Sequence, residues 1–195
     1  MIGVIMYGPP AAGKSTVTEA LSRLNPEYQL FRRLKVGYGR TEDYRMTTDA
    51  EIEALRANNE IIWENRRYDS AYFVDRHGLA EALMRCVPVV HLGQVDAIAS
   101  VLTAVADARW LLVSLWCPRD VAEERIVERN TGDTMDRLNA WDATDPVAAD
   151  IAIDTAKLTP SEAAQLIDRS LRGILSAAAW SPAIDPGRVG RYARE

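Results

Sequence analysis

Gly8-Pro9-Pro10-Ala11-Ala12-Gly13-Lys14-Ser15-Thr16 matches the pattern G-x-x-x-x-G-K-[ST] at every position. Residues 2–7 before it are largely apolar and predict a short buried strand. After it, Val17, Leu21 and Leu24 recur at helical spacing, which predicts a helix over 14–24. A strand, a loop closed by glycines and a helix, in this order, are typical of a phosphate-binding loop.

The chemistry of this loop depends on its main chain. Its glycines allow successive N–H groups and the start of the helix to point at one anion. Lys14 would reach the β- and γ-phosphates, and the Ser15 hydroxyl would be a ligand of Mg²⁺. We therefore expect residues 8–16 to bind a nucleoside triphosphate together with Mg²⁺. An ordinary glycine turn ahead of a helix is the alternative, and the matching flanks disfavour it.

Length and composition narrow the class of protein. The chain has 195 residues, 48% of them hydrophobic and 26% charged, which suits a single α/β domain spanning 1–195. A net charge of −5 argues against a protein that coats nucleic acid. No apolar run reaches the ~18 residues that a membrane-spanning helix needs, and no signal peptide is visible. Cys86 and Cys117 show no metal-ligand spacing, so we expect reduced thiols. Together these features favour a cytoplasmic location, and we expect a monomer or homodimer.

Downstream of the first helix, apolar runs alternate with helical segments. Strands are expected at 87–92, 110–116 and 150–154, and helices at 95–108 and 119–129. This alternation predicts a three-layer, doubly wound α/β fold with a parallel sheet of about five strands. The ligands of such sheets gather at the carboxyl ends of the strands. A last helix is expected over 158–179, with a surface tail after it at about 180–195.

The segment from about 26 to 76 interrupts this alternation. It contains five of the seven tyrosines, both phenylalanines and many arginines, with few long apolar runs. We expect it to be an insertion that covers the acceptor substrate, because long excursions in compact domains usually have a function. A solvated excursion without a function is the alternative.

Two blocks of this segment resemble the guanylate-kinase-like branch of the P-loop nucleoside monophosphate kinases, and the resemblance covers roughly residues 1–170. The first block is Arg32-Arg33-Leu34-Lys35-Val36-Gly37 followed by Asp43-Tyr44, and the second is 58–64 followed by Tyr72. The resemblance implies that Arg32 and Lys35 hold an acceptor phosphate, with Arg33 a close second to Arg32. It also implies that Tyr44 and Tyr72 bind this phosphate.

The chain departs from that family where guanine is recognised. The family has acidic side chains at the positions of Trp63 and Gly93, and Gln94 or Asp96 is the nearest polar replacement for the second. Phe73 also replaces the glycine of a Tyr-Gly pair. The phosphate-holding positions are therefore kept better than those that recognise guanine. The resemblance implies a phosphotransferase for a small phosphorylated acceptor, first of all a nucleoside monophosphate, in an enzyme that is not a strict guanylate kinase.

A third block, 125–140, resembles the lid of the same family. Arg125 and Arg129 are four residues apart and share one helix face, a Gly/Thr turn comes next, and Arg137 lies in the second helix. Arginines there would stabilise the charge on the transferring phosphoryl group. A solvated helix whose arginines pair with neighbouring glutamates is the alternative. Asp154 begins a segment that resembles the loop packed on an adenine, which makes ATP the expected donor.

Asp75 distinguishes two kinds of acceptor. A phosphate is already anionic at neutral pH and needs little base catalysis, whereas a hydroxyl acceptor needs a general base. Asp75 ends a short apolar run and is the candidate for that base. The alternatives to a monophosphate kinase are therefore a small-molecule O-kinase that phosphorylates a hydroxyl of a sugar phosphate, metabolite or antibiotic, and a non-catalytic nucleotide-binding module. The intact loop with Lys14 and Ser15 disfavours the module.

Overall fold

The computed structural model describes residues 1–39, 41–67, 69–130 and 132–176. Its strands are β1 (Ile2–Tyr7), β2 (Tyr28–Leu30), β3 (Arg33–Val36), β4 (Tyr44–Met46), β5 (Ile61–Arg67), β6 (Ser70–Asp75), β7 (Val87–Leu92), β8 (Arg109–Trp116) and β9 (Ile151–Asp154). Its helices are α1 (Lys14–Leu24), α2 (Asp49–Ala57), α3 (Arg76–Arg85), α4 (Val95–Ala104), α5 (Arg119–Arg129), α6 (Thr134–Asp142) and α7 (Pro160–Ser176). The tail expected at about 180–195 lies outside the described residues.

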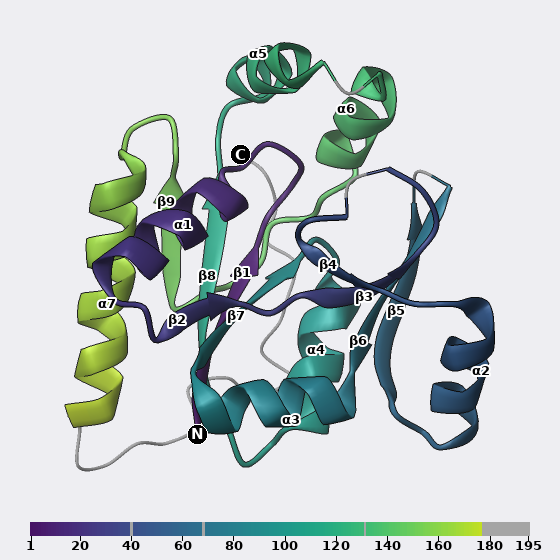
Figure 1. Ribbon diagram of the computed structural model, residues 1–195. Helices are drawn as coiled ribbons and strands as arrows, with labels where there is room; N and C mark the ends of the chain where they lie inside the picture. The colour runs from purple at the N-terminus through teal and green to yellow at the C-terminus, as the bar shows by residue number, and fades with distance from the viewer. Residues whose placement is uncertain (40, 68, 131, 177–195) are drawn as a thin grey trace.

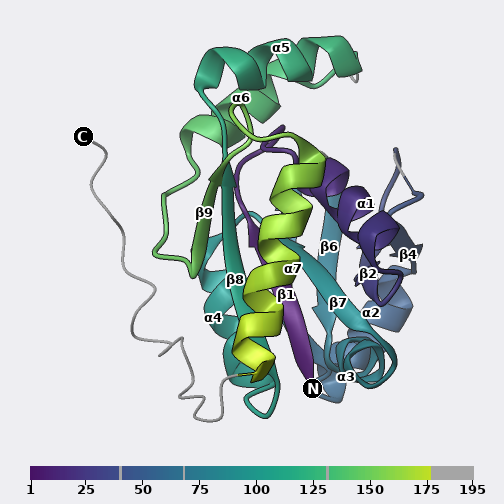
Figure 2. The same cartoon turned by 90° about the vertical axis from the view of Figure 1, so that its left-hand side faces the viewer.

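Five parallel strands form the central sheet in the order β2-β7-β1-β8-β9. α1 and α7 cover one face and α3 and α4 the other, so the molecule has three layers (Figures 1 and 2). This arrangement confirms the predicted α/β fold. β1 lies in the middle of the sheet because its residues from Val4 to Tyr7 are apolar and buried on both faces.

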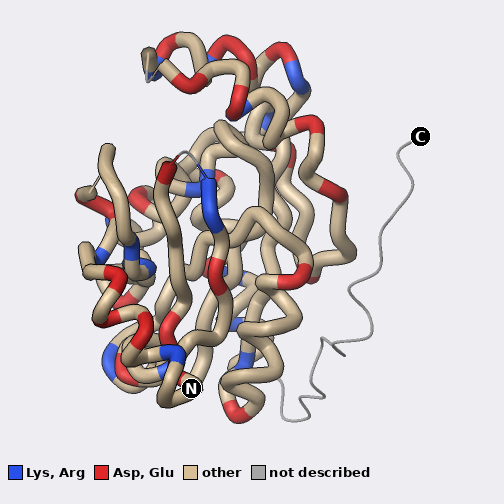
Figure 3. Tube along the Cα trace, turned by 90° about the vertical axis from the view of Figure 1, so that its right-hand side faces the viewer, with Lys and Arg blue, Asp and Glu red and all other residues tan. Residues whose placement is uncertain are grey.

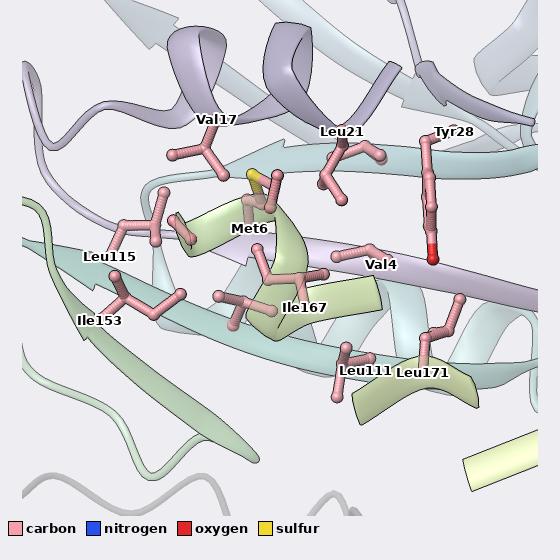
Figure 4. Packing of buried hydrophobic residues seen from close by; sticks show 14 of the residues in the cluster. Val4, Met6, Val17, Leu21, Tyr28, Leu111, Leu115, Ile153, Ile167 and Leu171 are labelled. Atoms are coloured by element: carbon pink, nitrogen blue, oxygen red, sulfur yellow. The ribbon is translucent and has the colours of Figure 1, made fainter. Parts of the chain in front are cut away.

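The core between the sheet and α1 and α7 fixes the position of the glycine loop. Leu21 of α1 and Ile167 of α7 point toward Val4 and Met6 of β1 (Figure 4), and all four side chains are fully buried. Burying a side chain of this size contributes about 1.5–3 kcal/mol relative to leaving it in water. The start of α1, which comes directly after the loop, is therefore held firmly against β1.

A second sheet of four strands lies beside the central one, in the order β4-β3-β6-β5. β3 pairs parallel with β4 and antiparallel with β6, and β5 pairs antiparallel with β6. Ile52 of α2 clusters with Ala71 and Phe73 of β6. One face of the second sheet is thus covered by α2, and the opposite face carries polar side chains.

The segment expected to form one insertion from about 26 to 76 is divided between the two sheets. β2 is an edge strand of the central sheet. Its Tyr28 is buried and donates a hydrogen bond to Asp168 Oδ1 at 2.9 Å. The second sheet and α2 occupy 33–75. A strand of three residues is too short to show an apolar–polar alternation, so periodicity does not separate β2 from the strands of the second sheet.

α5 and α6 form a helical pair beyond the edge of the central sheet that carries the glycine loop (Figures 1 and 2). Ala122 and Ile126 of α5 and Leu138 of α6 cluster with Ala11 of the loop and with Cys117. Because the pair packs on the loop itself, Arg125 of α5 reaches the carbonyl oxygen of Ala11 at 3.1 Å. This pair occupies the region expected to be the lid.

The distribution of charge does not single out one kind of binding partner. In the view of Figure 3, basic and acidic residues are interspersed along the chain, in keeping with its net charge of −5. No helix in the described part of the chain is both long and apolar enough to cross a membrane. The cytoplasmic location, the absence of a nucleic-acid partner and the oligomeric state stay predictions.

Candidate active site

The glycine loop has the backbone geometry that an anion site needs. Ala11 and Gly13 lie in the left-handed region, with φ of 61° and 87°. A side chain at Gly8 would place its Cβ 2.2 Å from the carbonyl oxygen of Leu115, so only glycine fits there. Gly13 is the N-cap of α1, so the free N–H groups of the first helical turn adjoin the loop. These features fit a bound polyphosphate.

Lys14 is the first residue of α1, and its side chain folds back over the loop. Nζ donates hydrogen bonds to the carbonyl oxygens of Gly8 at 2.6 Å and Pro9 at 2.8 Å. Burial, together with the guanidinium groups of Arg33, Arg129 and Arg67, lowers the pKa of Lys14 to about 7. A cation surrounded by other cations favours a ligand with several negative charges, because such a ligand relieves their repulsion.

The three arginines whose charges lower the pKa of Lys14 come from separate parts of the chain. Arg33 lies in β3, Arg67 ends β5 and Arg129 ends α5. Arg33 and Arg129 are predicted from the sequence as site residues, whereas Arg67 is missed. Strand alternation could have indicated Arg67. Trp63, Asn65 and Arg67 are two residues apart along β5, so they lie on the same face of the strand.

Arg33, Lys35, Tyr44 and Tyr72 form one cluster on the second sheet. Arg33 lies opposite Tyr44, and Lys35 lies opposite Tyr72. The two tyrosine ring centroids are 5.2 Å apart, and Lys35 Nζ lies 5.5 and 5.7 Å from them. Arg33 Cζ lies 5.9 Å from the Tyr44 centroid and 5.4 Å from that of Tyr72. Lys35 is only 2% exposed, and burial lowers its pKa. The structure thus brings these four predicted residues together.

Arg32 lies apart from this cluster. Its side chain is exposed, and its carbonyl oxygen accepts a hydrogen bond from Arg45 Nε at 2.8 Å. It borders a different cavity of about 670 Å³ together with residues of β2 and α3. Alternate residues of a strand share a face, so Arg33 and not Arg32 lies on the side of Lys35. The arginine that the resemblance ranks second is therefore the one that joins the cluster.

Arg125 lines a cavity of about 430 Å³ beside the glycine loop. This cavity is bordered by the start of α1, by α5 and by the loop after β9, through Ala11, Gly13, Thr16, Val17, Arg125, Glu128, Arg129, Thr155, Leu158 and Pro160. Its place next to the triphosphate loop suits the nucleoside part of the donor. Asp154 shapes the adjoining loop, since its Oδ1 accepts a hydrogen bond from the Ala156 N–H at 3.0 Å.

Arg137 lies in the first turns of α6. Its Nε donates to Asp133 Oδ1 at 2.6 Å, which fixes the guanidinium close to the start of the helix. The acid and the arginine are both largely buried, at 21% and 24% side-chain exposure. Arg137 therefore has a defined position in the α5–α6 pair.

Asp75 has structural partners that occupy its carboxylate. It is the N-cap of α3, where Oδ2 accepts a hydrogen bond from the Gly78 N–H at 2.9 Å. Both carboxylate oxygens also bind the guanidinium of Arg45, and Asp75 is 5% exposed. Figure 1 shows α3 at the end of the molecule opposite α5. This placement gives Asp75 a capping and pairing role, and its role as a general base stays a prediction.

The residues that could hold Mg²⁺ are few. Ser15 comes directly after Lys14 at the start of α1, as the loop pattern requires. Among the residues that the structure describes, no three His, Cys, Asp or Glu side chains are grouped to bind a metal ion. The loop pattern predicts that Ser15, together with the phosphate oxygens of a bound nucleotide, would hold Mg²⁺.

Trp63 and Gln94 lie where the second sheet meets α4. Trp63 packs against the core cluster that includes Ile98 of α4, and Val95 packs against the same cluster. The indole Nε1 of Trp63 is buried and has no hydrogen-bond partner within the described ranges. Gln94 is the N-cap of α4 but makes no side-chain capping bond. The Trp63 indole is thus left without a hydrogen-bond partner among the described residues, and the Gln94 side chain does not cap its helix.

Three comparisons relate the chain to known proteins. A family model described as chloramphenicol phosphotransferase-like protein matches residues 2–172. No curated protein matches the chain. The structure of guanylate kinase from Anaplasma phagocytophilum is similar with a TM-score of 0.59 and 16% identity, over 91% of this chain and 87% of that one. The crystal structure of APE1195 is similar with a TM-score of 0.53 and 13% identity, over 90% of this chain and 97% of that one. At these identities the two structures show a shared fold.

Proposed function

The chain belongs to the chloramphenicol phosphotransferase-like family of P-loop kinases, and we propose from the cations around its glycine loop that it phosphorylates a small acceptor that already carries a phosphate. A nucleoside monophosphate is the first candidate. Family and fold make the chain an ATP-dependent phosphotransferase, which confirms the predicted P-loop kinase and sets aside the non-catalytic module. The closer resemblance to guanylate-kinase-like enzymes stays a prediction.

The observation that carries this proposal is the convergence of cations on the glycine loop. Arg33 and Arg67 of the second sheet and Arg129 of the lid lie near enough for their charges to lower the pKa of Lys14. Lys35, with Tyr44 and Tyr72, adds a buried ammonium and two phenol groups on the same side as Arg33. One nucleoside triphosphate would occupy the loop and the lid. The cluster on the second sheet would then be free to bind a second anionic group, that of the acceptor.

This division assigns roles to the chain's residues. The N–H groups of the loop and Lys14 would hold the donor phosphates. Arg33, Lys35, Tyr44 and Tyr72 would hold the acceptor phosphate. Arg129 and Arg67 would stabilise the charge that develops between donor and acceptor. Bound Mg²⁺ supplies further charge neutralisation. The acceptor phosphate is anionic at neutral pH, so no general base is required.

A kinase for an unphosphorylated alcohol is the second candidate, and the family description favours it. Chloramphenicol, named in that description, carries hydroxyl groups and no phosphate. A hydroxyl acceptor needs a base close to the loop. The carboxylate that the sequence offered, Asp75, is bound by Arg45 and by the start of α3. The site chemistry therefore favours the phosphorylated acceptor.

The test compares paired acceptors in the presence of ATP and Mg²⁺. Nucleoside monophosphates and sugar phosphates are assayed for ADP release beside the same compounds without their phosphate, and beside chloramphenicol. We expect turnover of at least one phosphorylated acceptor and none of its dephosphorylated partner. Turnover of an alcohol with no turnover of any monophosphate contradicts the proposal and supports the second candidate.

A further inference from the structure

Arg32 and Arg45 border a cavity of about 670 Å³ that the proposed reaction leaves unused. Residues of β2 together with Phe31 form one wall, and α3, at the end of the molecule opposite α5 (Figure 1), forms another. Among the described residues that border the cavity, none belongs to the glycine loop or to the cluster of Arg33 and Lys35. Its volume is typical of sites for small molecules. The cavity is thus separate from the proposed donor and acceptor sites.

The guanidinium of Arg45 is held in one position at the wall of this cavity. Nη1 and Nη2 each donate to a carboxylate oxygen of Asp75, and Nε donates to the carbonyl oxygen of Arg32 at 2.8 Å. The guanidinium also lies over the Phe31 ring, with Cζ 5.3 Å from the centroid. A side chain at Gly78 would place its Cβ 2.6 Å from Nη1, so the glycine leaves room for the group.

Arg45 keeps donors for a ligand in spite of these bonds. A guanidinium has five N–H groups, two of them on each Nη. Within the described part of the chain, each Nη uses one N–H for Asp75 and has a second without a partner. The side chain is 39% exposed and borders the cavity. A ligand there would meet a fixed cation that loses little conformational entropy on binding.

Arg32 adds a charge that the chain does not balance. It is exposed, and its side chain makes no hydrogen bond or ion pair with the residues that the structure describes. The other charged residues at the cavity are engaged, since Arg85 pairs with Glu81 on α3 and Asp43 has a partner within the chain. Two adjacent arginines, one fixed and one unpaired, favour an anion that relieves their repulsion.

Apolar groups line much of the remaining cavity, from Leu30 and Phe31 on one side to Ala82 and Pro88 on the other. A site of this kind buries the apolar body of a ligand and orients it through a few polar groups. An inorganic ion would leave these apolar walls in water. The walls therefore favour an organic ligand over a free ion.

We propose that this cavity is a second binding site, which takes a small organic molecule with one oxyanion bound by Arg32 and Arg45. A carboxylate and a phosphomonoester both match the planar fork of a guanidinium, so the two share this chemistry. The body of the ligand is apolar or aromatic, in keeping with the walls. Binding at this site does not depend on the proposed function.

Cys86 provides a reporter inside the cavity. It borders the cavity and is half-buried, whereas Cys117 is fully buried beside the glycine loop. Burial raises the pKa of Cys86, so the reaction is run at mildly alkaline pH. The uncharged reagent N-ethylmaleimide modifies the thiols, and mass spectrometry of the two cysteine peptides follows each one separately. Protection of Cys86 then measures occupation of this cavity and of no other site.

The probes are phenyl phosphate, benzoate and benzyl alcohol, which share one ring and differ in charge. We expect at least one of the two anions to slow modification of Cys86 about tenfold or more at saturation, and benzyl alcohol to change it less than about twofold. Arg32→Met should raise the concentration for half-protection about tenfold, because it removes a charge-assisted hydrogen bond.

Two matched variants locate the effect. Arg169→Met changes an exposed arginine of α7 that does not border the cavity, and it should leave the protection unchanged. Arg33→Met should also leave it unchanged, because Arg33 belongs to the acceptor cluster. The melting temperature of each variant and its rate of Cys86 modification without a probe check that the fold and the cavity wall are kept.

Each outcome decides for or against the inference. Protection by phenyl phosphate alone supports it with a phosphomonoester as the ligand, and protection by benzoate alone supports it with a carboxylate. Unslowed modification with both anions, equal slowing by benzyl alcohol, or protection that survives Arg32→Met overturns it. Protection in an enzyme that turns over no phosphorylated acceptor supports this site and contradicts only the proposed function.

Discussion

Arg125 and Thr155 are joined by two hydrogen bonds, from Nη1 to Oγ1 at 2.9 Å and from Nη2 to the carbonyl oxygen at 2.8 Å. Nη1 also donates to the carbonyl oxygen of Ala11 at 3.1 Å. Helix α5 is thereby attached to the glycine loop and to the loop after β9. Arg129, one helical turn later, is exposed, and its charge lowers the pKa of Lys14. Two arginines that share a helix face thus have different surroundings.

This difference predicts different kinetic losses. Arg129→Met should lower kcat about 10²–10³-fold with little change in the KM for ATP, because its charge acts on the phosphoryl group in transit. Arg125→Met should mainly raise the KM for ATP, by about tenfold, and lower the free energy of unfolding by about 1–2 kcal/mol through its lost hydrogen bonds. Steady-state kinetics and urea unfolding of both variants measure this. Identical changes in kcat and KM for the two variants would contradict the separate roles of Arg125 and Arg129.

Adjacent arginines of the acceptor segment provide a second test. Arg33 lies on the face of Lys35 and the two tyrosines, whereas Arg32 is exposed beside another cavity. Arg33→Met should raise the KM for a phosphorylated acceptor about 10–100-fold, since it removes a charge-assisted hydrogen bond to the phosphate. Arg32→Met is the control and should change this KM less than twofold. A larger effect at Arg32 would mean that the acceptor phosphate binds elsewhere.

These arginines also show which parts of the candidate site can be predicted from the sequence alone. The glycine loop, α1 and the central strands are strong local patterns, so their fold could be predicted, while the role of Lys14 stays a prediction. Choosing between Arg32 and Arg33 needed the strand register, because a segment of four residues does not reveal where its alternation begins. Arg67 comes near Lys14 only because β5 pairs with β6, which is a contact that no short motif encodes. The sequence does not show that Arg45 binds Asp75, so a free carboxylate and a paired one cannot be told apart from it.

Asp75 is expected to matter for stability and not for catalysis. Asp75→Asn should lower the free energy of unfolding by about 1–3 kcal/mol, because it weakens the cap of α3 and the pair with Arg45. The kcat of the folded variant should stay within about threefold. The exposed acid Asp107 supplies the control, since Asp107→Asn should change neither quantity. A loss of kcat by orders of magnitude without a loss of stability would instead identify Asp75 as a general base.

The lowered pKa of Lys14 predicts proton uptake on binding of the donor. With a pKa of about 7, Lys14 is mostly neutral at pH 8 in the free protein. Bound phosphates favour the charged ammonium and raise its pKa, so close to one proton should be taken up at pH 8. At pH 6 the side chain is already protonated, and the uptake should be near zero.

Calorimetry in two buffers of different ionisation enthalpy measures this uptake as MgATP is added. Lys14→Met should abolish it, whereas Lys157→Met, at a lysine whose side chain is 79% exposed, should not. The same uptake in Lys14→Met as in the unaltered protein would assign the proton to another group.

The central claim is that the cations around Lys14 direct the γ-phosphoryl group of ATP onto another phosphate. The most direct measurement is ³¹P NMR of the product formed with the acceptor that the enzyme turns over fastest. We predict a phosphoanhydride, seen as two coupled phosphorus resonances of a new diphosphate beside those of ADP. A new uncoupled phosphomonoester resonance, with the acceptor phosphate unchanged, would contradict this claim and show transfer to a hydroxyl.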